Sequence, residues 1–171
     1  GSPLSINSLR EDLGVAHKTA ASWLDLLDSL YYSFRISPLQ GSRIKSMRKE
    51  GKVYLWDWSD IKDEGARLEN MVASHLLKFS HFLNSVHGWK TALHFLRDQE
   101  GREVDFVFTF EGKPWFAVEV KSSARPSKHL RYFGDRMKIN HIFLVTPEPR
   151  LDYTSDGVRT ISLARFLAAL V

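Results

Sequence analysis

The feature that most constrains the fold is the stretch VDFVFTFEGKPWFAVEVK, residues 104–121, which reads as two strands joined by a turn. Two runs rich in aromatic and β-branched residues flank EGK, a combination typical of a β-hairpin. Side chains alternate between two faces along a strand, so the pattern predicts which residues share a face. The first strand separates Val104, Phe106, Phe108 and Phe110 from Glu103, Asp105, Val107 and Thr109. The second strand separates Phe116, Val118 and Val120 from Trp115, Ala117, Glu119 and Lys121.

Matching the apolar faces fixes which charged residues meet across the hairpin. Burial of a large apolar side chain contributes ~1.5–3 kcal/mol, so the two apolar faces are expected to coincide. A three-residue loop or a bulge then places Asp105 opposite Glu119, with the side chains about 5 Å apart. A strictly two-residue loop would break this parity. Two carboxylates at that spacing repel each other by about 3 kcal/mol at an effective dielectric of about 20.

Two explanations account for such a pair. Lys121 lies on the face of Glu119 and offsets part of the repulsion, which would give an ion-pair network at the sheet surface. A divalent cation would offset the repulsion more completely, and Mg²⁺ or Mn²⁺ suits a site of few carboxylate oxygens. The chain has no cysteine, and its seven histidines show no H-E-x-x-H spacing, which argues against zinc.

The segment EGARLENMVASHLL adds a third carboxylate from a helix. Glu69 shares a helical face with Val72, Ala73 and Leu76, so it lies on the apolar stripe or at its edge. A carboxylate there is either a metal ligand or a member of a buried ion pair with Arg67, Lys121 or another base.

The first 62 residues have a different character. Ser5 to Leu13 and His17 to Leu30 are predicted helices, and Tyr31 to Ile36 and Lys52 to Trp58 are predicted strands. Helix, turn, helix and hairpin together resemble a winged-helix domain, assigned to residues 3–62. The loop between the strands carries four basic residues, which would contact DNA or form a solvated surface: Arg43, Lys45, Arg48 and Lys49. At the start of the second helix, Lys18, Thr19 and Ser22 could face a major groove or water.

The remainder alternates helix and strand signals. The expected elements are a helix over 63–87, strands over Ala92–Arg97, Arg102–Phe110 and Pro114–Lys121, a helix over Ser127–Met137, strands over His141–Thr146 and Val158–Ile161, and a last helix over 162–171. This αβββαβ order predicts an α/β (α+β) domain over residues 63–171 with a central mixed sheet.

These residues carry a family resemblance. Asp105, thirteen intervening residues and Glu119-Val120-Lys121, preceded by a helix bearing Glu69, resemble the PD-(D/E)xK fold of restriction endonucleases and Holliday-junction resolvases. The segments KVYLWDWSDI, GARLENMVASHLL, EVDFVF and AVEVKSS are similar to a domain at the C-terminus of prokaryotic AAA+ ATPase-like proteins, there following a winged helix. The proline of the PD signature is absent, because Val104 precedes Asp105.

The resemblance implies roles for individual residues. Asp105 and Glu119 would hold one or two Mg²⁺ ions, with the Val120 carbonyl as an additional ligand. Lys121 would orient or activate the attacking water and stabilise charge on the phosphate. Glu69 would complete the outer metal shell. The implied reaction is metal-dependent hydrolysis of a DNA phosphodiester.

Partners and location follow from the same features. A net charge of +4 permits a polyanionic partner such as DNA. No apolar run approaches the ~20 residues that span a bilayer, and a cytoplasmic location is expected. No G-x-x-x-x-G-K-[ST] motif occurs in this chain. The resemblance therefore implies that the AAA+ ATPase domain lies in a preceding segment and that this chain is a C-terminal fragment. A homo-oligomer is compatible with these features. The alternatives to a nuclease are an inactive nucleic-acid-binding module and a protein-docking module of the ATPase.

Overall fold

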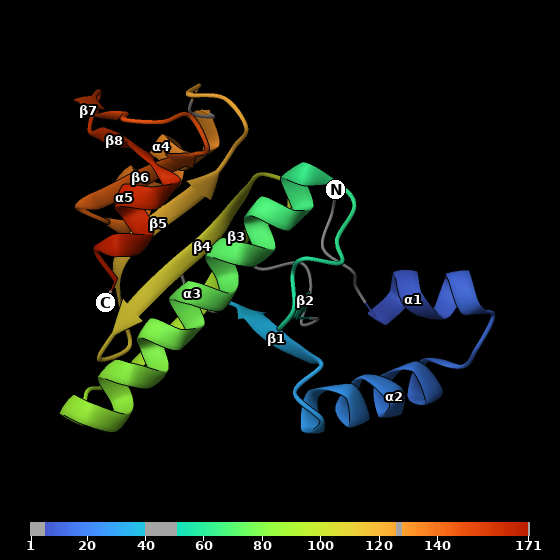
Figure 1. Cartoon of the computed structure of the whole chain (residues 1–171). Helices are drawn as coiled ribbons and strands as arrows, with labels where there is room; N and C mark the ends of the chain where they lie inside the picture. The colour runs from blue at the N-terminus through green and yellow to red at the C-terminus, as the bar shows by residue number, and fades with distance from the viewer. Residues whose placement is uncertain (1–5, 40–50, 126–127, 171) are drawn as a thin grey trace.

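The computed structural model describes residues 6–39, 51–125 and 128–170 and contains one mixed sheet with helices on both faces (Figure 1). The predicted helices and strands occur in the predicted order, with one further strand, β7, and the fold is mixed α+β. The elements are α1 (Ile6–Leu13), α2 (His17–Ser29), β1 (Ser33–Pro38), β2 (Lys52–Leu55), α3 (Glu64–His87), β3 (Thr91–Arg97), β4 (Glu103–Phe110), β5 (Lys113–Val120), α4 (Lys128–Met137), β6 (His141–Thr146), β7 (Asp152–Ser155), β8 (Val158–Ser162) and α5 (Leu163–Ala168).

The sheet has the strand order β2-β1-β3-β4-β5-β6-β8-β7. Neighbours are parallel at β1–β3, β5–β6 and β6–β8, and antiparallel at the four other pairings. The connection between the parallel strands β5 and β6 runs through α4, as a crossover connection requires. Strand β7 lacks apolar alternation and is exposed throughout, which is why the sequence pattern did not predict it.

Two apolar clusters lie between the sheet and the helices, one on each face of the sheet. On one face, α3 and α5 pack against the sheet around Phe106, Phe108 and Val118. On the other face, α4 packs through Leu130 and Phe133. Figure 1 shows α4 behind the sheet, with α3 and α5 in front. None of the helices in the described ranges is long and apolar enough to cross a membrane.

Helix α3 positions one side of the candidate site. The Asp63 carboxylate accepts a hydrogen bond from the Ala66 N–H and caps the helix N-terminus, and Gly88, with φ of 68°, ends the helix in the left-handed region. The side chain of Asn70, only 3% exposed, donates to the Leu55 carbonyl (2.6 Å) and accepts from the Leu55 N–H (2.8 Å). It therefore ties the edge strand β2 to α3.

The β4–β5 hairpin has a two-residue turn and a bulge. Phe110 pairs with Lys113 across Glu111 and Gly112, whose positive φ values of 49° and 73° suit a tight hairpin turn. The register then shifts, because Thr109 pairs with Pro114 but Phe108 pairs with Phe116. Trp115 is the extra residue. The bulge restores the parity that a two-residue loop would otherwise break, so Phe106 pairs with Val118 as the apolar faces require.

A second irregularity lies between β3 and β4. His94 pairs with Val107, and Leu96 pairs with Val104. Two residues of β4, Asp105 and Phe106, therefore lie opposite the single residue Phe95 of β3. Strict alternation predicts Val104 on the face of Phe106. The prediction for Val104 is wrong, because the bulge moves it into the α4-side cluster beside Leu96.

The N-terminal hairpin extends the main sheet. Ser37 of β1 pairs in parallel with His94 of β3, and β2 forms the edge. Helices α1 and α2 pack around Ala20 and Leu24 against Val53 of β2. The strands are shorter or shifted relative to the predicted ranges, since β1 begins at Ser33 and β2 ends at Leu55. The assignment of residues 3–62 to a winged helix stays a prediction.

Candidate functional site

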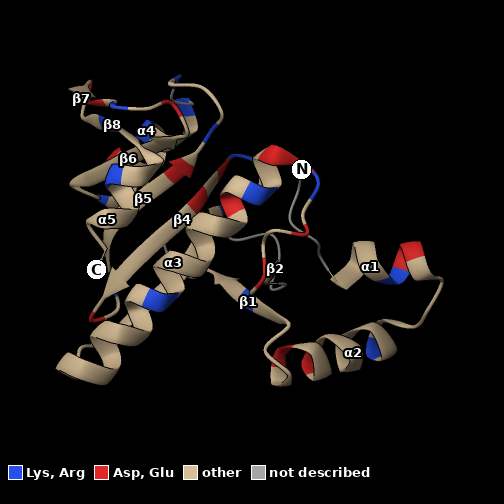
Figure 2. Cartoon of the chain, in the orientation of Figure 1, with Lys and Arg blue, Asp and Glu red and all other residues tan. Residues whose placement is uncertain are grey.

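The candidate site lies where β4 and β5 stop pairing. The ladder ends at Phe106 and Val118, one step before Asp105 and Glu119. Figure 2 shows acidic segments of β4, β5 and α3 at this end of the hairpin. Asp105 reaches across the gap, and its Oδ2 accepts a hydrogen bond from the Val120 N–H at 2.8 Å. The carboxylate thus replaces the backbone acceptor that a continued ladder would supply.

Burial and nearby negative charges make ionisation of the Asp105 carboxyl unfavourable. Burial is the largest cause that raises the pKa of this carboxyl, to about 7, and the charges of Glu69 and Glu119 raise it further. The Lys52 ammonium and the Val120 N–H act in the opposite direction. A carboxyl with this pKa is only partly ionised at neutral pH, whereas an ordinary aspartate is fully ionised.

Glu69 lies on α3, and its carboxylate is held by two residues of β2. The Tyr54 hydroxyl donates to Glu69 Oε1 at 2.8 Å, and Lys52 Nζ lies 3.3 Å from the same oxygen. Burial, followed by the Glu69 charge, raises the pKa of Tyr54 well above its usual value. Of the explanations for Glu69, an ion pair with a base is therefore present, and the base is Lys52. Its role in an outer metal shell stays a prediction.

Lys52 is the cation at the centre of this network. It is 7% exposed and forms ion pairs with both Glu69 and Glu103, and Arg97 pairs with the second oxygen of Glu103. Burial by itself lowers the pKa of Lys52, but the surrounding carboxylates outweigh burial and raise it. Lys52 therefore stays charged inside the sheet.

Glu119 and Lys121 form a separate pair. Glu119 is 6% exposed, and Lys121 Nζ lies 3.3 Å from its Oε1. In β5 the side chain of Glu119 alternates with Val118 and Val120, which pack on the α3 side. Glu119 thus projects toward the face that α4 covers, whereas Glu69 approaches from α3. The charges of both Glu69 and Glu119 act on Asp105. The predicted juxtaposition of the Asp105 and Glu119 carboxylates stays a prediction.

The carboxylate oxygens of the site are the kind of ligand that a hard cation prefers. Two groups of ion pairs act on or lie beside Asp105: Glu69 and Glu103 with Lys52 and Arg97, and Glu119 with Lys121. We name Glu69, Glu103, Asp105 and Glu119 the acidic cluster. A divalent ion at Asp105 would offset the excess negative charge and favour its ionised form. Within the ranges that the structure describes, no group of three or more acidic or histidine side chains is arranged to hold a metal. Water and the Val120 carbonyl would have to supply the remaining ligands.

Lys52 and Tyr54 were not predicted from the sequence as site residues. The signal was present, because alternation in KVY places Lys52 and Tyr54 on one face of a strand. Their partner on α3, however, lies 15 to 17 residues away in the sequence. No periodicity within β2 indicates that contact.

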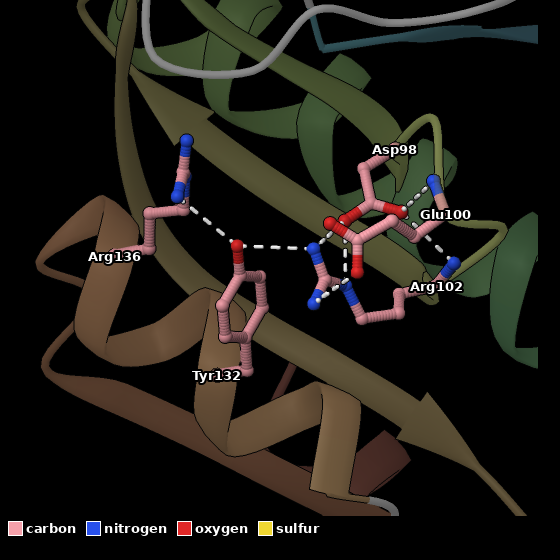
Figure 3. Close-up of polar contacts among 5 residues, drawn as sticks. All are labelled: Asp98, Glu100, Arg102, Tyr132 and Arg136. Carbon is pink, nitrogen blue, oxygen red and sulfur yellow. Dashed lines mark hydrogen bonds and ion pairs between the residues drawn. The ribbon is translucent and has the colours of Figure 1, made fainter.

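A second polar network lies beside the start of β4. Figure 3 shows Arg102 paired with Asp98 and Glu100, while its guanidinium donates to the Tyr132 hydroxyl at 3.1 Å. Arg136 donates to the same hydroxyl, and Arg102 stacks 4.0 Å from the Tyr132 ring centre. This network joins the β3–β4 turn to α4 and so fixes the segment that precedes Glu103.

The predicted DNA-binding residues fall into two groups. Lys18 and Ser22 are exposed on the first turns of α2, and Thr19 is partly exposed. Arg43, Lys45, Arg48 and Lys49 lie outside the described residues. DNA contact by either group stays a prediction.

The fold and the site together define a mixed α+β domain with a carboxylate cluster at a diverging hairpin. The chain belongs to the DUF4143 family, described as a domain of unknown function, whose profile matches residues 64–166. That domain is commonly found with AAA ATPases, in agreement with the ATPase-associated resemblance. A second domain of unknown function, DUF8612, matches residues 1–59. No curated protein and no solved structure matches the chain.

Proposed function

We propose that this chain is the nuclease-like part of an ATPase-associated protein and that it hydrolyses DNA phosphodiesters with Mg²⁺ or Mn²⁺. The observation that supports the proposal best is the Asp105 carboxyl at the gap between β4 and β5, where burial and then the charges of Glu69 and Glu119 raise its pKa. Carboxyl groups with strongly shifted pKa values occur most often at functional sites. The resemblance to the PD-(D/E)xK fold adds the reaction class.

Each residue then has a distinct task. Asp105 and Glu119 would hold the ion, which supplies a Lewis acid and an activated water. The Lys121 ammonium would stabilise negative charge on the phosphate during in-line attack by water. Lys52 pairs with Glu69 and Glu103 and its charge favours ionisation of Asp105, so it is a positioning residue that makes no contact with substrate.

The test is thermal unfolding with and without metal. A ligand at one hundred times its dissociation constant stabilises a fold by about 2.7 kcal/mol, so millimolar Mg²⁺ or Mn²⁺ should raise the Tm. Asp105→Asn and Glu119→Gln should abolish the shift, and Glu64→Gln, on an exposed residue at the start of α3, should retain it. Lys121→Met should retain the shift but lose cleavage of single-stranded, duplex or branched DNA. No shift and no cleavage with either ion would contradict the proposal.

The second candidate is a catalytically silent nucleic-acid-binding or docking module. The ion pairs of Glu69 with Lys52 and of Glu119 with Lys121 favour it, because they satisfy two of the acids without a metal. This candidate predicts salt-dependent DNA binding that survives Asp105→Asn and falls on substitution of Arg48 and Lys49. Absence of DNA binding even at low salt would leave protein docking as its function.

A further inference from the structure

A cavity of about 640 Å³ lies between α3 and α5, away from the acidic cluster. Its apolar walls and floor are formed by Phe79, Phe116, Phe143, Ile161, Phe166 and Leu170. We name it the α3–α5 pocket. Phe116 precedes Glu119 by three residues along β5, a separation of about 10 Å at ~3.3 Å per residue. The volume is in the range of cavities that hold ligands or buried partner side chains.

An aromatic surface leads into the pocket. Trp115 contacts Phe110 and Phe116, Phe110 contacts Trp89, and Trp89 stacks on His87 at the end of α3. Phe110, Trp89 and Trp115 are each more than a third exposed. A contiguous exposed surface of large aromatic side chains beside a pocket is typical of protein-interaction sites, where such side chains are enriched.

The bulge in β5 creates the rim of the pocket. Strict alternation would place Trp115 on the face of Ala117 and Glu119. Because Trp115 is the inserted residue, its ring instead contacts Phe108 and Phe116 on the α3 side and remains 39% exposed. Bulges commonly re-aim a side chain in this way.

The polar end of the pocket carries an excess positive charge. Arg159 donates to both oxygens of Asp152, at 2.8 and 2.9 Å. Arg165 donates to one of these oxygens over a longer distance, 3.4 Å. Two guanidinium groups thus share one carboxylate. Arg165 is the more weakly held of the two, and its side chain is half exposed. A second carboxylate at Arg165 would balance the charges and gain a charge-assisted hydrogen bond.

We propose that the α3–α5 pocket is a docking site for a segment of a partner protein that presents a large apolar side chain directly beside a carboxylate. The apolar side chain packs among Phe143, Phe166 and Trp115, and the carboxylate pairs with Arg165. A nucleobase fits less well, because the apolar walls would leave its polar edge without hydrogen bonds. This site is independent of the acidic cluster and does not require nuclease activity.

The test uses three acetylated tetrapeptides ending in Phe, Leu or Trp, each as the free acid and as the C-terminal amide. Titration of the whole chain is followed by calorimetry and by the indole resonance of Trp115. At least one free acid should bind about fivefold more tightly than its amide, as an exposed ion pair permits. Arg165→Gln should remove the difference between acid and amide. Trp115→Ala should weaken both forms.

Matched controls separate docking from loss of folding. Arg131→Gln changes an arginine of similar exposure on α4, and Trp23→Ala removes a tryptophan of similar exposure on α2, so both should bind like the unchanged chain. The proposal is overturned if no free acid binds or if acid and amide bind equally. It is also overturned if oligothymidylate displaces the peptides, or if Trp115→Ala disperses a self-associated form that excludes them.

Discussion

Asp105 is the residue whose ionisation the fold disfavours but the proposed metal binding requires. Its carboxyl has a pKa of about 7 in the folded chain, against an ordinary value of 3.8. Between about pH 4 and pH 7 the folded chain therefore keeps a proton that the unfolded chain has released. The free energy of unfolding must fall as the pH rises through this window. Metal binding, which needs the ionised form, should weaken as the pH falls below 7.

Asp105→Asn should remove this pH dependence. The amide oxygen still accepts a hydrogen bond from the Val120 N–H, but the side chain cannot ionise. Without metal, the variant should be more stable than the unchanged chain at about pH 8, by about 2 kcal/mol, and the difference should shrink at about pH 5. Urea unfolding across this range measures it, with Asp60→Asn as the exposed control. An equal effect at both pH values would contradict the assigned pKa.

Lys52→Met should destabilise the chain because it leaves Glu69 and Glu103 without their shared cation. Removal of one partner from a buried ion pair costs about 3 kcal/mol or more, whereas Lys62→Met, on an exposed residue, should change little. Urea unfolding measures both. The double variant Lys52→Met with Glu69→Gln should recover part of the loss, because the stranded charge is gone. Additive losses would show that the pair does not interact.

At the scale of elements, the edge strand β2 depends on α3. Four residues make a short strand, and its outer edge has no neighbouring strand in the sheet. Asn70 compensates by binding both backbone groups of Leu55 from α3. This contact, together with the Tyr54–Glu69 hydrogen bond, holds β2 against the helix. It thereby positions Lys52 beside Glu69 and Glu103.

Asn70→Leu should loosen β2 without unfolding the remaining sheet. Both backbone groups of Leu55 lose their partner, at a cost of about 2 kcal/mol in stability. Amide exchange at Leu55 should become at least tenfold faster, and exchange in β5 should change much less. Met71→Leu, at the neighbouring partly buried position, is the control. Unchanged protection at Leu55 would show that Asn70 does not secure the strand.

At the scale of the whole molecule, the N-terminal hairpin is part of the main sheet. Phe34, Ile36 and Tyr54 belong to the same apolar cluster as Val72 and Phe106. The two family profiles nevertheless divide the chain between residues 59 and 64, near the predicted boundary at 62 and 63. The family profiles and the continuous sheet therefore give different answers about folding. The profiles suggest that the chain from residue 63 onward folds alone, whereas the sheet indicates that it needs β1 and β2.

Truncation distinguishes these answers. Removal of residues 1–30 takes away α1 and α2 but leaves β1, β2 and Lys52, so a cooperative unfolding transition should remain. Removal of residues 1–62 takes away three core side chains and the cation between Glu69 and Glu103, so the remaining chain should lose near-ultraviolet circular dichroism and cooperative unfolding. A cooperative, stable chain from residue 63 onward would show that the boundary is a folding boundary.

The sequence by itself determined the order of all elements except β7, the β4–β5 hairpin and the placement of Glu69 at the edge of an apolar stripe. These features are local, since periodicity of 2.0 or 3.6 residues is set by the geometry of a single strand or helix. The tertiary structure decided the two bulges, the pairing of Lys52 with Glu69, and the pocket beside Trp115. Each depends on which strand or helix lies alongside. Pairing partners far apart in the sequence leave no periodic signal in either segment.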